Sequence, residues 1–142
     1  MAKTNCDFLI IGTGATGTAM MAQLAKMKPT KPFSVVVVEK NKEFGPGFPY
    51  NSDVVLPDHL VNIAAGCTDI TKTDIRYSEL SDFVEWVKSL PAERREAYGL
   101  GGIFEQTNII PPRYVIGEYL KERFKQFSQQ AQRNGVGITF IS

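Results

Sequence analysis

The apolar positions near the start of the chain predict a strand, a helix and a second strand. Phe8–Ile11 is a continuous apolar run that ends at Gly12, as expected for a strand buried on both faces of a parallel sheet. Apolar residues within Ala15–Met27 recur at helical spacing, and the prolines that follow would end a helix. The valines of Val35–Val38 favour a second strand. Because crossovers of this kind are almost always right-handed, we expect two adjacent parallel strands joined right-handedly through the helix.

The rest of the chain is predicted to hold two more helices and a third strand. Residues 43–73 carry glycines and prolines without sustained periodicity, which indicates an ordered loop with a functional role. Apolar residues between positions 80 and 87 at helical spacing predict a short helix. Pro112 is suited to the first turn of a long helix that ends near Asn134–Gly135. Residues 137–141 predict the last strand.

Composition excludes several classes of partner and bounds the size of the protein. The 142 residues suit one domain, residues 1–142, and the formal charge of +1 gives no broad field for nucleic acid or an anionic membrane. Four strongly apolar residues, Phe8–Ile11, are too few for a signal peptide or a membrane span. Cys6 and Cys67 lack metal-ligand spacing. We therefore expect a soluble, cytoplasmic protein with reduced thiols and no metal site, while the oligomeric state stays open.

A glycine-rich motif lies between the first predicted strand and the first predicted helix. In such a motif the first glycine allows a tight turn, the second lets the backbone approach a pyrophosphate, and the third lets helix and strand pack closely. The phosphates then meet free N–H groups at the positive end of the helix dipole. The motif predicts a dinucleotide site, although a structural turn would also explain the glycines. Its residues are Gly12, Thr13, Gly14, Ala15, Thr16 and Gly17.

An acidic residue at the end of the second strand suggests which dinucleotide binds. Glu39 stands near the position where a carboxylate accepts both hydroxyls of an adenosine ribose. The same charge would repel a 2′-phosphate and so disfavours NADP, although the neighbouring Lys40 weakens that exclusion. The alternative is a solvated charge at a strand end. We include both residues among the candidates for cofactor binding.

Together, these and later motifs resemble the N-terminal part of a bacterial family of FAD/NAD(P)-binding oxidoreductases, distantly similar to flavin-dependent N-hydroxylating monooxygenases. The resemblance implies an α/β fold, with a Rossmann-type parallel sheet and helices on both faces. That fold is incomplete here relative to a full flavoprotein, because members of the family are several times longer. The resemblance also implies FAD as cofactor and NAD(P)H as a possible electron donor. The motifs are Gly12–Gly17, Glu39 with Gly45–Tyr50, His59–Ala65, Asp82–Trp86, and Pro112–Tyr114 followed by Gly117 and Tyr119–Leu120.

Further candidate residues follow from the loop and from this resemblance. The glycines Gly45 and Gly47 would let backbone approach the ribityl or pyrophosphate chain, or they form a plain turn. Asn62 would bond to the flavin side of the cofactor or to local backbone. In the family that the chain resembles, an arginine at the place of Arg113 reaches the FAD pyrophosphate. The alternative is a solvated arginine paired with an acid of its own helix.

Three functions are compatible with these residues. The first is the FAD-binding portion of a flavin-dependent oxidoreductase with NAD(P)H as donor. The second is a non-catalytic nucleotide-binding module, and the third is an NAD-dependent dehydrogenase domain, which the glycines and Glu39 alone do not exclude. No nucleophile–base set is visible, so no catalytic residue is assigned. We expect this chain alone to be inactive, because a flavin site normally encloses the reactive ring.

Overall fold

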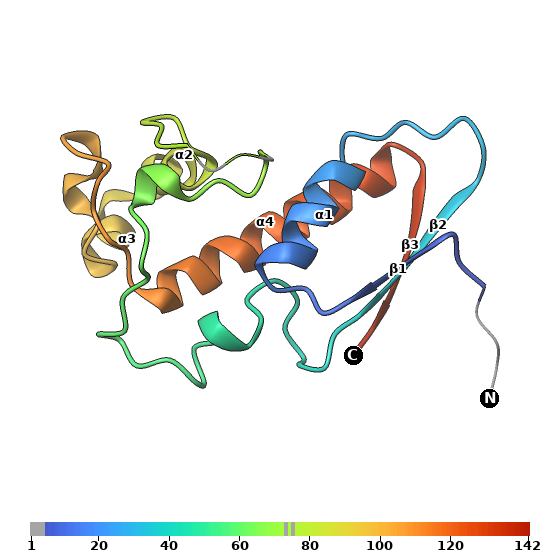
Figure 1. Cartoon of the computed structure of the whole chain (residues 1–142), viewed down its shortest axis with the longest axis horizontal. Coiled ribbons are helices and arrows are strands. Elements are labelled where there is room, and N and C mark those ends of the chain that lie inside the picture. Colours follow the sequence, from blue (N-terminus) through green and yellow to red (C-terminus); the bar gives the residue numbers. More distant parts are fainter. Residues whose placement is uncertain (1–4, 73, 75) are drawn as a thin grey trace. The chain divides into compact units, whose positions relative to one another are not determined.

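The computed structural model describes residues 5–72, 74 and 76–142 of the chain (Figure 1). The chain divides into two compact units, which are described separately. Unit 1 contains Met1–Gly47 and Leu120–Ser142, and unit 2 contains Phe48–Tyr119. The organisation as one domain over residues 1–142 stays a prediction.

Unit 1 is built on a parallel sheet of three strands in the described residues. The strands are β1 (Phe8–Ile11), β2 (Phe33–Val38) and β3 (Val136–Ile141), arranged in the order β1-β2-β3. In β1 and β2, Phe8 pairs with Val35 and Ile11 with Val38. The predicted adjacent, parallel strands are therefore confirmed, and with them the α/β class and the Rossmann-type sheet. Helix α1 (Ala15–Leu24) connects β1 to β2 along the chain, and it ends earlier than the predicted helix, which extended to Met27 (Figure 1).

The core of unit 1 lies on one face of this sheet. Alternate strand residues, among them Ile10, Val35 and Val37, form one buried cluster with α1 and with α4 (Arg113–Arg133), of which residues 120–133 belong to unit 1. The helices contribute the apolar side chains Met21, Leu24, Phe124 and Ala131 to this cluster. Both helices of unit 1 therefore pack on the same face, where the sequence predicted helices on both faces.

The opposite face of the sheet is largely uncovered within unit 1. Successive strand residues point to opposite faces, so Leu9, Ile11 and Ile141 share the face that the cluster does not use. The side chain of Ile11 is 79% exposed and that of Leu9 is 50% exposed. The prediction that Phe8–Ile11 is buried on both faces is therefore wrong for the described residues. A continuous apolar run shows that a strand can be buried on both faces, but it does not supply the second layer.

Unit 2 consists of short helices around an aromatic centre. Ser81 caps α2 (Asp82–Ser89), because its side chain accepts a hydrogen bond from the N–H of Val84. The ring of Phe83 lies edge-on to Tyr119, at 5.1 Å between ring centroids, and both side chains are fully buried. The remaining elements are α3 (Ala92–Ala97) and three 3₁₀ turns at Phe48–Tyr50, Ala65–Cys67 and Gly101–Phe104.

Two further features differ from the sequence-based prediction. The apolar pattern assigned no element to residues 92–104, where α3 and a 3₁₀ turn form. Helix α4 begins at Arg113, and Pro112 precedes it, with its carbonyl accepting from the N–H groups of Val115 and Ile116. Pro112 therefore caps the helix instead of occupying its first turn. No helix in the described part of the chain is both long and apolar enough to cross a membrane.

The close approach of α1 to the end of β1 leads to the first prediction. A Cβ atom at Gly17 would overlap the carbonyl oxygen of Gly12, so one of the two backbone segments would have to shift. We expect Gly17→Ala to lower the free energy of unfolding by about 2 kcal/mol, despite alanine's better helix propensity. The measurement is denaturant unfolding followed by circular dichroism.

The matched control is Gly137→Ala, where the added Cβ would make an ordinary contact with the carbonyl oxygen of Phe33 at 3.5 Å. We expect no loss of stability there, because alanine suits a strand better than glycine does. Equal effects of the two substitutions would contradict the steric argument.

Candidate functional site

The glycine-rich motif forms the turn between β1 and α1. The N–H of Gly12 donates to the carbonyl of Val38 at 2.7 Å, which extends the pairing of β1 with β2 by one residue. Gly12 has a φ of 82°, a conformation that favours glycine. Gly14 then begins the helix, and its carbonyl accepts from the N–H of Thr18 at 2.9 Å. The chain thus reverses within a few residues, as the sequence predicted.

A buried carboxylate ties this turn to the end of β2. One oxygen of Glu39, Oε2, accepts from the backbone N–H of Thr13 at 2.8 Å and from the Thr13 hydroxyl at 2.6 Å. The same hydroxyl accepts from the N–H of Gly45 at 2.9 Å. The other oxygen, Oε1, accepts from the N–H of Asn41 at 3.1 Å. Glu39 is only 5% exposed, so these bonds replace the water it would otherwise bind.

These bonds set the ionisation of Glu39. Burial acts to raise the pKa of this carboxyl, but hydrogen bonds from the Thr13 hydroxyl and from nearby backbone N–H groups outweigh burial. The pKa of Glu39 is therefore held below its ordinary value. The residue is a carboxylate at neutral pH, as a role in accepting hydroxyl groups requires.

The second glycine loop, which contains Gly45 and Gly47, lies against the turn of Gly12–Gly17. A Cβ built on Gly14 would lie 3.6 Å from the Cα of Gly47, so these two backbones are close neighbours. Gly45 has a φ of 117°, and a Cβ there would lie 2.5 Å from the Cα of Lys121 on α4. The structure therefore gives Gly45 a packing role of its own. Gly45 and Gly47 therefore both lie beside the turn that contains Gly14.

An anion would fit at the start of α1. The first N–H groups of a helix have no partner within the helix, and here they belong to Ala15, Thr16 and Gly17. The side chains of Ala15 and Thr16 are exposed, and no acidic residue stands in the first turn. Among the described residues that are not its neighbours in the chain, only Gly47 has an atom within 4 Å of a Cβ built on Gly14. The turn thus offers N–H donors and uncrowded backbone, which suits the pyrophosphate of a dinucleotide.

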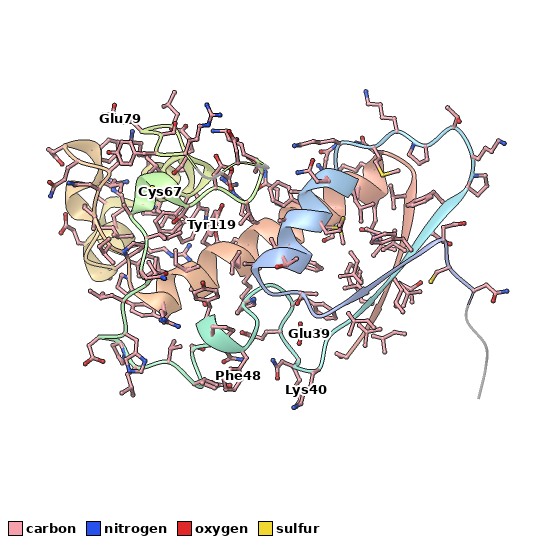
Figure 2. All side chains as sticks on the ribbon, viewed as in Figure 1. Glu39, Lys40, Phe48, Cys67, Glu79 and Tyr119 are labelled. Carbon is pink, nitrogen blue, oxygen red and sulfur yellow. The ribbon has the colours of Figure 1, made fainter. Side chains whose placement is uncertain are left out.

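Glu39 and Lys40 differ in what they can offer a ligand. The Oε2 atom of Glu39 already accepts two hydrogen bonds, so Oε1 is the oxygen with capacity to spare. The role of Glu39 in accepting the ribose hydroxyls stays a prediction. The side chain of Lys40 is exposed (Figure 2).

The candidates Asn62 and Arg113 belong to unit 2. Asn62 is exposed, and its side chain makes no hydrogen bond to any described residue, so the expected bond to local backbone is not formed. Arg113 donates from Nε to the carbonyl of Leu60 at 3.1 Å and from its backbone N–H to the carbonyl of His59 at 2.7 Å. Its terminal nitrogens have no partner within the described residues.

A recess surrounds the side chain of Arg113. It has a volume of about 520 Å³ and is lined by Arg113 with Asp58, His59 and Leu60. The nearby acid of the same helix, Glu118, instead pairs with Arg94 at 3.8 Å. The predicted alternative, in which Arg113 pairs with Glu118 or Glu122, is not observed, because Arg113 forms no ion pair with either residue.

Sequence reasoning missed the role of the Thr13 side chain. The hydroxyl is fully buried and bonds both Glu39 and Gly45, and the Thr13 carbonyl accepts from the hydroxyl of Thr18 at 2.8 Å. The one available signal was a hydroxyl residue between two glycines, followed by an acid at the end of the next strand. Only the turn's geometry brings these residues together.

Comparison with known proteins agrees with this geometry. Residues 9–142 match the model of a protein family described as FAD-NAD(P)-binding. A curated relative is the protein YdhS of Escherichia coli (strain K12), described as uncharacterized, which is 26% identical over 129 residues. The aligned part is 91% of this chain and 22% of the relative. The chain therefore spans about a fifth of the length of that relative.

The Thr13–Glu39 bond leads to a prediction about stability and pH. We expect Thr13→Val to lower the free energy of unfolding by about 2 kcal/mol at pH 7, because a buried carboxylate loses a donor. The pKa of Glu39 is lowered in the folded protein, so its contribution is present above the ordinary pKa of 4.5 and is lost as the pH falls through the folded-state value. The difference between parent and variant should therefore shrink below about pH 4.

Unfolding curves recorded from pH 7 to pH 3 measure this difference. The control is Thr16→Val, an exposed threonine of the same turn, for which we expect a change within about 0.5 kcal/mol at every pH. A constant difference between parent and Thr13→Val over the whole pH range would show that Glu39 is not the partner that matters.

Proposed function

Because the chain belongs to the FAD-NAD(P)-binding family, we propose that it is the FAD-binding portion of a flavin-dependent oxidoreductase that takes electrons from NAD(P)H. This membership confirms the family resemblance of its motifs. The observation that carries the proposal is the turn of Gly12–Gly17, whose free N–H groups suit an anion. Hydrogen bonds from Thr13 to Glu39 fix the conformation of this turn. A bound flavin supplies the redox chemistry, while the protein binds and orients it.

The residues of unit 1 divide the adenosine and phosphate parts of the cofactor between them. The N–H groups at the start of α1 bind the pyrophosphate, and the absence of a side chain at Gly14 lets it approach the backbone. Glu39 Oε1 accepts one ribose hydroxyl. Its negative charge disfavours a 2′-phosphate, so this site takes FAD or NAD in preference to NADP. Gly47 allows close approach of the second loop.

Two residues of unit 2 are proposed as further cofactor ligands on the family resemblance alone. Arg113 contributes its terminal nitrogens to the cofactor's phosphates, since a guanidinium can bond two phosphate oxygens at once. Its bond to the Leu60 carbonyl would fix the direction of the fork. Asn62 offers a free amide to the flavin side of the cofactor. The reaction and substrate of the whole protein are further proposals, because the chain spans about a fifth of its curated relative.

The turn and Glu39 also fit a second function, the binding of NAD in a dehydrogenase. The two dinucleotides share the adenosine and pyrophosphate that these residues recognise. The nucleotide that binds more tightly therefore distinguishes the two functions. A third possibility, a non-catalytic module, predicts nucleotide binding without oxidation of NAD(P)H even by the whole protein of which the chain is a part.

Titration of the purified chain with FAD, NAD and NADP tests the proposal. We expect saturable quenching of flavin fluorescence, tighter binding of FAD than of NAD, and the weakest binding of NADP. Gly14→Ala should fold normally, because its Cβ makes an ordinary contact at 3.6 Å, yet its affinity for FAD should fall about tenfold or more. The control Gly102→Ala, whose Cβ would also make only ordinary contacts, should bind like the parent.

Tighter binding of NAD than of FAD would favour the dehydrogenase and contradict the proposal. If none of the three nucleotides binds, every function in which this chain holds a dinucleotide is contradicted. An unchanged affinity of Gly14→Ala for FAD would place the nucleotide somewhere other than the glycine-rich turn.

A further prediction concerns the binding of FAD by Arg113. If its guanidinium binds phosphate, Arg113→Ala should weaken FAD binding about tenfold, with Arg113→Lys intermediate, because an ammonium acts as a point charge. The loss should be smaller at high salt, where charges are screened. The control is Arg133→Ala, an exposed arginine in the last turn of the same helix. Parent-like binding by both Arg113 variants would assign this arginine to structure alone.

A further inference from the structure

The outer edge of β3 has unpaired backbone groups. Strand β3 is the last in the order β1-β2-β3, and the carbonyl of Ile141 faces inward, where it accepts from the N–H of Glu39 at 2.9 Å. Backbone groups alternate along a strand, so the N–H and C=O groups of Ile138 and Phe140 point away from the sheet. No described residue is recorded as bonding to them.

This edge also lacks the features that usually protect an exposed strand. Val136–Ile141 contains no charged residue and no proline, the devices with which proteins prevent a further strand from pairing. The side chains of Phe140 and Ile141 are 40% and 45% exposed. Within the part of the chain that the structure describes, nothing at this edge prevents another extended segment from pairing with it.

An aromatic groove runs beside the edge, on the face of the sheet that carries the helices. Its volume is about 610 Å³, and the rings of Phe44, Phe124 and Phe140 form its apolar part. The ring of Phe44 stacks on Phe124, with 5.8 Å between the centroids, and lies edge-on to Phe140 at 5.3 Å. The groove can therefore take an apolar side chain that comes from the β3 edge.

The rim of this groove is positively charged. Lys121 Nζ bonds Glu43 Oε1 at 2.6 Å, so that pair is balanced. Lys42 and Lys125 also line the groove, and neither has a carboxylate partner among the described residues. The chain as a whole carries only +1, so this is a local excess of positive charge. Such a rim favours a ligand that carries carboxylates.

The dimensions of the groove suit an extended peptide. Along α4 it reaches from Lys121 to Gln132, which is about 16 Å at the rise of a helix. This is about the length of five residues in a strand. In an added strand, residues two positions apart share a face, so an apolar side chain beside Phe140 would have its neighbours on that face about 7 Å away.

We propose that the β3 edge and this groove form a docking site for an extended acidic segment of a partner protein. The segment adds a strand to the sheet through the outward N–H and C=O groups of Ile138 and Phe140. One apolar side chain of the segment enters the groove between the phenyl rings. Carboxylates two positions away bind Lys42 and Lys125. The recess beside β1 is lined by no charged residue, so it offers no comparable contacts to the carboxylates of such a segment.

Nuclear magnetic resonance of the ¹⁵N-labelled chain tests the proposal. The probe is the capped peptide Ser-Glu-Val-Phe-Val-Glu-Ser, in which phenylalanine and both glutamates share one face. We expect saturable shifts of the amide signals of Ile138 and Phe140, together with that of Lys42. A second peptide with glutamine at both glutamate positions should bind about fivefold more weakly or worse, because it lacks the two charge contacts.

Matched charge variants separate this site from general electrostatics. The double variant Lys42→Glu, Lys125→Glu should bind the probe about tenfold more weakly. The control Lys28→Glu, Lys31→Glu changes the net charge equally at two exposed residues between α1 and β2, and it should bind like the parent. Equal losses in both double variants would overturn the proposal.

Two further measurements can contradict the proposal. Shifts at Lys42 without shifts at Ile138 and Phe140 would mean that the groove takes a carboxylate without strand pairing. Shifts at β3 that grow with the concentration of the chain alone, without peptide, would make a second copy the occupant. A variant Ile138→Pro removes one outward N–H while leaving the bonds to β2. If it keeps the parent's amide spectrum elsewhere in unit 1 and still binds with parent affinity, strand addition is excluded.

Discussion

The buried carboxylate of Glu39 links the parts of unit 1 on which the candidate site depends. It receives two hydrogen bonds from Thr13, and the Thr13 hydroxyl receives a third from Gly45, so three separate segments meet at one point. A carboxylate with so little exposure would be costly without such donors. A shift of the turn, of the end of β2 or of the loop with Gly45 would remove hydrogen-bond donors from the buried Glu39 carboxylate. The cost of that loss stabilises the position of all three segments.

That constraint has a consequence for function. The N–H of Thr13 is directed to Glu39, while the N–H groups at the start of α1 keep no partner of their own within the helix. Donors that are already fixed in position need no reorganisation when an anion binds. In the function we propose, Glu39, the residue after β2, thereby fixes the turn that binds phosphate, and its second oxygen accepts a sugar hydroxyl. The match to a family described as FAD-NAD(P)-binding agrees with this division of tasks.

The sheet shows how far local pattern reaches. Adjacent, parallel β1 and β2 followed from two apolar runs around a helix, and the register of Phe8 with Val35 confirms this arrangement. The same runs suggested burial on both faces, yet Ile11 is 79% exposed. A continuous apolar run places apolar side chains on both faces of a strand, so both faces can be buried. The layer that buries a face comes from elements far away in the sequence. Residues 92–104 likewise gave no pattern, because their short helices are too brief for periodicity to be seen.

The sequence by itself determined the order of the main elements, the glycine-rich turn and the acid that follows β2, since each depends on steric or periodic properties of neighbouring residues. Only the tertiary structure decided that the Thr13 hydroxyl binds Glu39, that Gly45 packs on α4, and that both helices of unit 1 share one face. These contacts join residues distant in the chain. Their geometry depends on how the helices fill the space beside the sheet, and no local pattern of residues records that.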